Sequence, residues 1–148
     1  MASMPDIQER IERFPTACRS AGLKVTPQRI AVFSMLVNTK THPSPEEVFI
    51  EIRKTSPSIS LATVYKILEM FHLKGFIKRV STNDQVTRYD GNLEPHHHVI
   101  CNQCGSIKDI MGVADKLPEP TNGELGGFRI TSKEIQYHGT CADCASKN

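Results

Sequence analysis

Two Cys-x2-Cys pairs constrain the fold of this 148-residue chain more than any other feature. Cys101 pairs with Cys104 and Cys141 with Cys144, and 36 residues separate the two pairs. In a reducing compartment such pairs bind a metal far more often than they form disulfides, because the short spacing lets both sulfurs point inward. An iron–sulfur cluster and redox disulfides are the alternatives. The sequence therefore predicts a structural zinc ion that ties two distant segments together.

A run of three histidines, His96 to His98, lies just before the first cysteine pair. If residues 96–101 form a strand, His96 and His98 share one face, whereas His97 lies on the other. Imidazole binds Fe, Mn, Ni, Cu or Zn, whereas a full set of thiolates selects zinc or an iron–sulfur cluster. The sequence thus predicts a second metal site next to the first, with His97 structural or exposed.

A carboxylate is expected beside this histidine pair. If the two cysteines of the first pair lie opposite each other in a hairpin, Asp109 lies opposite His96 and on the same face. The resulting three ligands leave positions open. His42, in the loop before the third expected helix, and Asp90, at the end of the expected wing, are candidates to fill them. Ligands from two domains would let metal binding fix the angle between those domains.

The first 90 residues show four helical patterns and then a hairpin pattern. Pro27 and Pro45 follow the capping residues Thr26 and Ser44, and Ser60 precedes a fourth apolar stripe. The expected helices span 7–21, 27–39, 45–56 and 61–74, and the expected strands span 76–80 and 86–90. This order predicts a winged helix-turn-helix.

A helix-turn-helix places its second helix in the major groove of DNA, where polar residues near the helix start reach base edges. That helix is expected at residues 61–74. The expected contacts from this helix are Thr63, Tyr65 and Lys66, and those from the wing are Lys78, Arg79 and Arg88. The alternative is a small α+β domain whose polar face has no role, because helical bundles with a trailing hairpin serve other purposes.

The second half of the chain has a different composition. Turn residues fill 91–95, strands are expected at 96–101 and 106–110, and an alternating run covers 128–138. A domain of under about 60 residues is small for a stable core, so a structural metal and oligomerisation are both expected. The prediction is an α+β chain with a DNA-binding domain at 1–90, a hinge at 91–95 and a β-rich dimerisation domain at 96–148.

Charge and hydropathy limit the classes of function. Residues 1–90 carry 13 Lys and Arg against 9 Asp and Glu, whereas residues 91–148 carry 5 against 7. Only the charge of the first half favours a polyanionic partner, although a charge difference of this size also arises by chance on a solvated surface. No apolar run approaches the roughly 20 residues of a membrane span, and no signal peptide is recognised. We expect a cytoplasmic protein without a membrane partner, in which Cys18 is a buried apolar residue.

Several motifs together resemble the ferric uptake regulator family of bacterial metal-dependent repressors, most of all its peroxide-sensing branch. The resemblance covers essentially the whole chain. The motifs are Leu23-x-Val25-Thr26-Pro27-Gln28-Arg29, Thr41-His42-Pro43, Ser60-Leu61-Ala62-Thr63-Val64-Tyr65, Thr87-Arg88-Tyr89-Asp90, His96-x-His98-Val99-Ile100-Cys101-x2-Cys104-Gly105 and Gly139-x-Cys141-x2-Cys144.

The resemblance implies a role for each set of residues. Structural zinc is held by the four cysteines of the pairs, and Arg29 and Ser60 join the DNA contacts. Metal binding closes a homodimer on a palindromic operator, and hydrogen peroxide oxidises a ligand histidine, His42 or His96, after which the metal is lost. The regulatory Fe(II) or Mn(II) is held by His42, Asp90, His96, His98 and Asp109.

Other functions remain open at this stage. The resemblance to the peroxide-sensing branch rests on Asp90, because iron-sensing relatives commonly have Glu at this position. The nearest alternative is therefore a repressor that senses iron, zinc or manganese levels. A zinc hydrolase such as a nucleobase deaminase would need a His-x-Glu motif and an open zinc position, which four cysteines would close. We therefore expect no enzyme and no small-molecule substrate other than peroxide as a signal. A zinc-ribbon interaction module without a DNA role is the third possibility.

Overall fold

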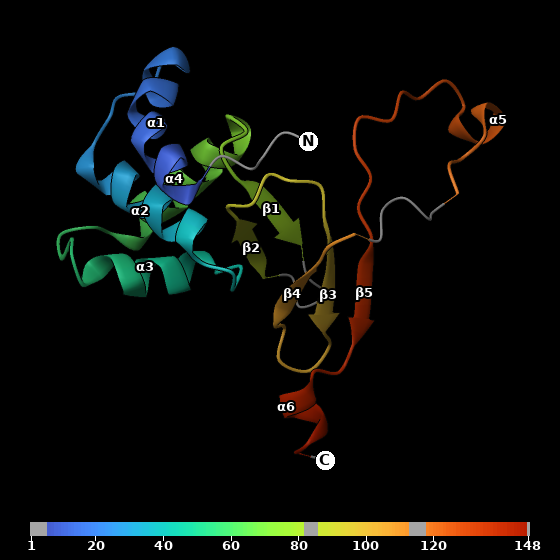
Figure 1. Ribbon diagram of the computed structural model, residues 1–148. Helices are drawn as coiled ribbons and strands as arrows, with labels where there is room; N and C mark the ends of the chain where they lie inside the picture. The colour runs from blue at the N-terminus through green and yellow to red at the C-terminus, as the bar shows by residue number, and fades with distance from the viewer. Residues whose placement is uncertain (1–5, 82–85, 113–117, 148) are drawn as a thin grey trace. The chain divides into compact units, whose positions relative to one another are not determined.

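The chain folds into two compact units that divide after Leu93, inside the expected hinge (Figure 1). The computed structural model describes residues 6–81, 86–112 and 118–147. The architecture is α+β, as predicted. The expected tip of the wing, 82–85, lies outside the described residues. Within the described ranges, no helix combines the length and apolarity needed to cross a bilayer.

Four helices build the N-terminal unit, and their caps explain where they begin. The Thr26 side chain accepts a hydrogen bond from Arg29 N–H, and Ser44 and Glu47 form a reciprocal capping box. Ser60 caps the last helix by accepting from Thr63 N–H. The helices are α1 (Ile7–Ser20), α2 (Pro27–Asn38), α3 (Pro45–Arg53) and α4 (Leu61–Leu73).

An aromatic cluster fills the centre of this unit. The rings of Phe14 and Phe33 stack with centroids 4.0 Å apart, and Phe71 meets Phe14 edge to face at 5.3 Å. Stacked and edge-to-face pairs both suit the quadrupole of the ring. Cys18 is fully buried in the same core, as expected of a small apolar side chain. These contacts hold α1, α2 and α4 together.

The wing consists of two antiparallel strands, β1 (Lys78–Ser81) and β2 (Thr87–Asp90). The first strand begins two residues later than predicted. Phe76 N–H donates to the Phe71 carbonyl and so closes the end of α4, which keeps Phe76 out of the strand. Asp90 ends β2, and Gly91 follows it directly.

A three-stranded sheet forms the second unit, in the order β4-β3-β5. Its strands are β3 (His97–Cys101), β4 (Ile107–Ile110) and β5 (Gln136–Gly139), and short helices α5 (Asn122–Leu125) and α6 (Ala142–Ala145) complete it. β5 pairs with β3 in parallel. Of the alternating run 128–138, only the residues from Gln136 onward form a strand, in which Gln136 pairs with His98 of β3.

The hairpin register differs from the prediction by two residues. Asp109 pairs with His98 rather than with His96. Cys101 N–H donates to the Ser106 carbonyl, so a four-residue turn joins the strands, with Gly105 at φ +71°. A shift of two residues preserves the face of every side chain, since successive side chains alternate. Asp109 therefore still lies on the face of the histidine pair.

The close approach of Gly91 to α2 leads to a first prediction. A Cβ at this position would lie 2.5 Å from the Leu36 carbonyl oxygen, so Gly91→Ala forces the chain after Asp90 away from α2. We expect a loss of about 1–3 kcal/mol in the free energy of unfolding of the N-terminal unit, measured by thermal denaturation. Gly123→Ala is the control, because its nearest neighbour is 3.9 Å away. Equal stability of the two variants would contradict the steric role of Gly91.

Candidate functional site

The four cysteines of the two pairs come together in the second unit. Their sulfurs lie within 4.8 Å of one another, and the Sγ atoms of Cys104 and Cys141 are 3.7 Å apart. Tetrahedral zinc with Zn–S bonds of about 2.3 Å needs sulfurs about 3.8 Å apart, whereas a disulfide needs about 2.05 Å. All the cysteines are free thiols. The geometry fits a structural zinc ion and not a disulfide.

Backbone hydrogen bonds prepare this cluster for a cation. The N–H groups of Cys104, Cys141 and Gln103 lower the pKa of the Cys101 thiol to about 6. Hydrogen bonding to Cys141, together with burial, raises the pKa of Cys144 to about 12. The four sulfurs therefore do not all ionise on their own, and zinc supplies the charge that lets them do so.

A second set of potential ligands begins in the N-terminal unit. His42 lies in the loop between α2 and α3 with φ +54°, a left-handed conformation that is uncommon for a residue with a Cβ. Its Nε2 is 3.3 Å from Oδ2 of Asp90. The other carboxylate oxygen of Asp90 accepts a hydrogen bond from Asn92 N–H at 2.8 Å. The end of the wing thus presents one imidazole and one carboxylate side by side.

The second unit contains three further potential metal ligands. Nε2 of His96 and Nε2 of His98 lie 3.3 and 3.4 Å from the same oxygen of Asp109, Oδ1. The two imidazole rings are 4.6 Å apart and nearly perpendicular. This set contains nitrogen and oxygen donors without thiolate, which suits Fe(II) or Mn(II) as well as zinc. The three residues that the sequence predicted to be neighbours are neighbours.

Hydrogen bonds on the far side of the rings set the imidazole tautomers. Nδ1 of His96 lies 2.6 Å from the Glu94 carbonyl oxygen, which can only accept, so this Nδ1 carries the proton. Nδ1 of His98 lies 2.7 Å from Oε1 of Glu134. In the neutral tautomer with the proton on Nδ1, the Nε2 atom of each ring, which faces Asp109, is the one with the lone pair that metal ligation requires.

Glu134 was not predicted as part of the site. It lies 36 residues from its histidine, in the alternating run 128–138, and no spacing signal links the two. His97, in contrast, behaves as predicted for a structural residue. It is 2% exposed, and its Nδ1 accepts a hydrogen bond from Ile135 N–H at 3.0 Å. This bond holds the segment before β5 close to β3.

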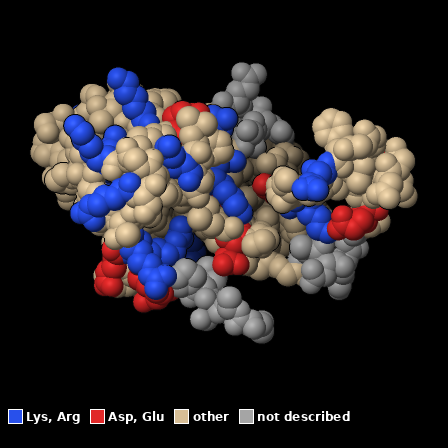
Figure 2. All heavy atoms as spheres, turned by 90° about the horizontal axis from the view of Figure 1, so that it is seen from above, with Lys and Arg blue, Asp and Glu red and all other residues tan. Residues whose placement is uncertain are grey.

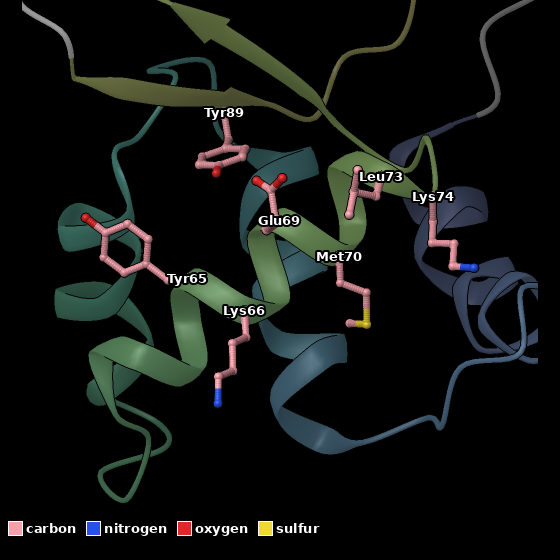
Figure 3. Close-up of a pocket in the computed structure, with 7 residues that line it drawn as sticks. All are labelled: Tyr65, Lys66, Glu69, Met70, Leu73, Lys74 and Tyr89. Carbon is pink, nitrogen blue, oxygen red and sulfur yellow. The ribbon is translucent and has the colours of Figure 1, made fainter.

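The expected DNA contacts of α4 bond largely within the N-terminal unit. Ser60 Oγ caps the helix by accepting from Thr63 N–H, and it lies 2.9 Å from Thr63 Oγ1. The Tyr65 hydroxyl donates to Glu46 on α3, and this bond lowers the pKa of the Glu46 carboxyl. In Figure 3, Lys66 points away from the wing and from Tyr65. Lys66 is exposed and remains accessible to a polyanion.

A groove of about 510 Å³ runs between α4 and the wing (Figure 3). Glu69 points across it toward Tyr89, and its carboxylate is 3.3 Å from the guanidinium of Arg79. Arg29, at the start of α2, donates to the Lys24 carbonyl. Lys78 lies in β1 opposite Asp90. On the face shown in Figure 2, the basic side chains form several separate groups rather than one patch.

Comparisons with known proteins point to the family that the sequence motifs resemble. The model of the Ferric uptake regulator family matches residues 20–138. The peroxide-responsive repressor PerR of Staphylococcus aureus is 32% identical over 141 residues, 95% of each chain. The Helicobacter pylori ferric uptake regulator Fur, whose structure reveals three functional metal binding sites, is 27% identical with a TM-score of 0.77 and covers 98% of this chain and 97% of its own. The Campylobacter jejuni peroxide stress regulator is 32% identical, with a TM-score of 0.66, and the match covers 90% of this chain and 98% of that protein.

Removal of zinc is expected to loosen the sheet of the second unit selectively. Cys101 is the last residue of β3, and Cys141 lies two residues after β5. A chelator should therefore speed amide hydrogen exchange in both strands while α2 and α4 keep their protection. Chelation should be faster at lower pH, because the thiols must be deprotonated to bind zinc. Full protection of residues 136–139 after zinc removal would contradict a structural role for the metal.

Substitution of Glu134 is expected to change the tautomer of His98. Glu134→Ala should increase the fraction of ring protons on Nε2, detected by ¹⁵N NMR of the histidine rings, and weaken Mn(II) binding about 10–100-fold. Glu134→Gln should lose less, because an amide oxygen still accepts from Nδ1. Glu119→Ala is the control, since this carboxylate pairs with Lys133 instead. Unchanged ring signals in Glu134→Ala would rule out the positioning role.

Proposed function

The chain belongs to the ferric uptake regulator family, and on this premise we propose that it is a metal-dependent transcriptional repressor, which binds operator DNA as a homodimer with Fe(II) or Mn(II) and is inactivated by hydrogen peroxide. One observation carries the proposal. Potential ligands occur on both sides of the hinge 91–95, with an imidazole–carboxylate pair before it and two imidazoles and a carboxylate after it.

The proposed regulatory site uses both sets of ligands. His42 and Asp90 supply two donors, and the second unit supplies three. Neither set alone surrounds a metal ion, so the two sets bind it more tightly together than apart. The difference in binding free energy between the closed and the open arrangement is then available to set the angle of the DNA-binding unit. This is how metal occupancy would control DNA affinity.

DNA recognition is assigned to α4 and the wing. The observed order of α1 to α4 followed by the β1–β2 hairpin supports this assignment, because the helix that follows the turn is the one that enters the major groove. The proposed contacts are Arg29, Ser60, Thr63, Tyr65, Lys66, Lys78 and Arg79. Lys and Arg among them would bind phosphates, which position the unit without reading sequence.

Self-association is assigned to the second unit. Phe128, Ile130 and Tyr137 are 82%, 44% and 41% exposed, although they occur in the alternating run that would suit a half-buried strand. Exposed apolar side chains of this kind are typical of a surface that a partner covers. A homodimer would bury them and would place two recognition helices on a palindromic operator.

Peroxide sensitivity is supported by the relatives named for it, each 32% identical to this chain. Bound Fe(II) would supply the reducing electron for peroxide cleavage next to the ligand imidazoles, whereas Mn(II) would not. His42 and His96 are the proposed targets of oxidation. An oxidised ring is a poorer ligand, so repression would end. We place the protein in the cytoplasm, where thiol ligands stay reduced.

The proposal is tested by DNA binding with and without the regulatory metal. A duplex is selected from a random-sequence pool with the Mn(II)-loaded protein, and its affinity is compared for loaded and Mn-free protein that retains structural zinc. We expect Mn(II) to increase the affinity about 5–150-fold, the usual range of allosteric coupling. His42→Ala should abolish the increase at the same Mn(II) concentration. DNA binding that ignores Mn(II) would contradict the proposal.

A second experiment, treatment with peroxide, distinguishes the two signals that such a repressor could sense, peroxide and metal level. Fe(II)-loaded and Mn(II)-loaded proteins are treated with hydrogen peroxide and digested for mass spectrometry. The peptides that contain His42 or His96 should gain the mass of one oxygen atom in the iron form only. If the iron form stays unmodified while Mn(II) still controls DNA binding, the protein senses metal level and not peroxide.

A further inference from the structure

We propose that Arg88 is a positioning residue of the regulatory metal site, which holds the His42 loop on the wing, and not a contact to DNA phosphate. The sequence had grouped Arg88 with the basic side chains of the wing. The inference rests on the proposed function, because it assumes that His42 is a metal ligand. All of the contacts that carry it lie within the N-terminal unit.

The Arg88 side chain points into its own unit. It is only 14% exposed, and its Nη1 lies 3.3 Å from the His42 carbonyl oxygen and 3.1 Å from Oε2 of Glu47. A single guanidinium nitrogen therefore bridges the loop that contains His42 and the first turn of α3. The charge of Arg88 is compensated by Glu47, whereas a phosphate contact would need the guanidinium turned outward to solvent.

Three successive residues of β2 bind the His42 loop. Arg88 donates to the carbonyl of His42, Tyr89 N–H donates to the carbonyl of Pro43 at 3.0 Å, and Asp90 faces the His42 ring at 3.3 Å. Each of these contacts crosses more than 40 positions of sequence. The loop is therefore held on the strand along its backbone as well as through the potential ligands themselves.

The conformation of His42 makes such support necessary. A residue with a Cβ in the left-handed region costs roughly 1–2 kcal/mol, and it persists only where surrounding contacts fix it. The hydrogen bond from Arg88 acts on the backbone of the strained residue itself. Without it, the loop would relax, and the Nε2 atom of His42 would leave the position next to Asp90.

Glu47 anchors the other end of this support. Its Oε2 accepts from Ser44 N–H at 2.8 Å in the capping box of α3, and the same oxygen receives Arg88. The position of Arg88 is thus set by a rigid helix start, which makes the guanidinium a fixed point for the loop. Charge-assisted hydrogen bonds to a carboxylate are stronger than neutral ones and keep this geometry.

Arg79 provides a matched comparison on the same wing. It lies in β1, its side chain is 42% exposed, and it pairs with Glu69 of α4 at 3.3 Å. Arg79 has the same charge and also has a carboxylate partner, but no described hydrogen bond joins it to the His42 loop. The two arginines therefore differ in whether they hydrogen-bond to the His42 loop, which is the property that the proposal concerns.

The test measures Mn(II) affinity and the salt dependence of DNA binding for Arg88→Met and Arg79→Met, both with intact zinc. We expect Arg88→Met to weaken Mn(II) binding roughly tenfold, as outer-shell substitutions do. Its DNA affinity at saturating Mn(II) should recover with an unchanged salt slope. Arg79→Met should keep its Mn(II) affinity. Loss of a phosphate contact would instead reduce the slope of log K against log salt by about 0.9.

Further variants make the outcome decisive even if Arg88→Met unfolds. The lysine of Arg88→Lys can reach one of the two acceptors, so this variant should lose less Mn(II) affinity than Arg88→Met. Glu47→Gln keeps the capping box of α3 but removes the negative charge that pairs with Arg88. Unchanged Mn(II) affinity in both variants would overturn the proposal. His42→Ala is titrated alongside: if it too keeps its Mn(II) affinity, the proposed site itself fails.

Discussion

The parallel pairing of β3 with β5 determines where the functional groups of the second unit lie. Parallel strands bring like ends together, so the pairing of Cys101 with Gly139 places the two cysteine pairs at one end of the sheet. The pairing of His98 with Gln136 brings Glu134 to the histidines at the other end. Parallel neighbours need a long connection, and residues 102–135 separate β3 from β5 in the sequence. A single strand pairing thus organises both the zinc ligands and the support of the regulatory ligands.

Local patterns predicted those parts of the site that depend on short range in the sequence. Cysteine spacing indicated the zinc ligands, and the period of two placed His96 and His98 on one face. The hairpin register was wrong because a four-residue turn ending at Gly105 replaced the assumed cross-strand cysteine pair. Glu134 was missed because its position depends on a parallel pairing that leaves no local signal. The acceptors of Arg88 were not predicted, because they lie more than 40 residues away in the sequence.

Acidic side chains lie next to two of the proposed DNA contacts of the N-terminal unit. Glu46 receives the Tyr65 hydroxyl, and Glu69 pairs with Arg79. A phosphate that approached Arg79 would compete with this carboxylate, although an exposed ion pair of this kind contributes only about 0–1 kcal/mol. Under the proposed function, such competition keeps the DNA affinity of a single unit low. Tight binding then depends on two units acting together, and that is the property a regulator can switch.

The left-handed backbone of His42 has a consequence for how such a protein evolves. Glycine adopts this conformation without strain, so a chain with glycine at position 42 would be free of a cost of roughly 1–2 kcal/mol. The same replacement removes the imidazole. Under the proposed function, selection for thermal robustness alone would favour chains that no longer respond to metal, and the histidine would be retained only while the metal response itself is under selection.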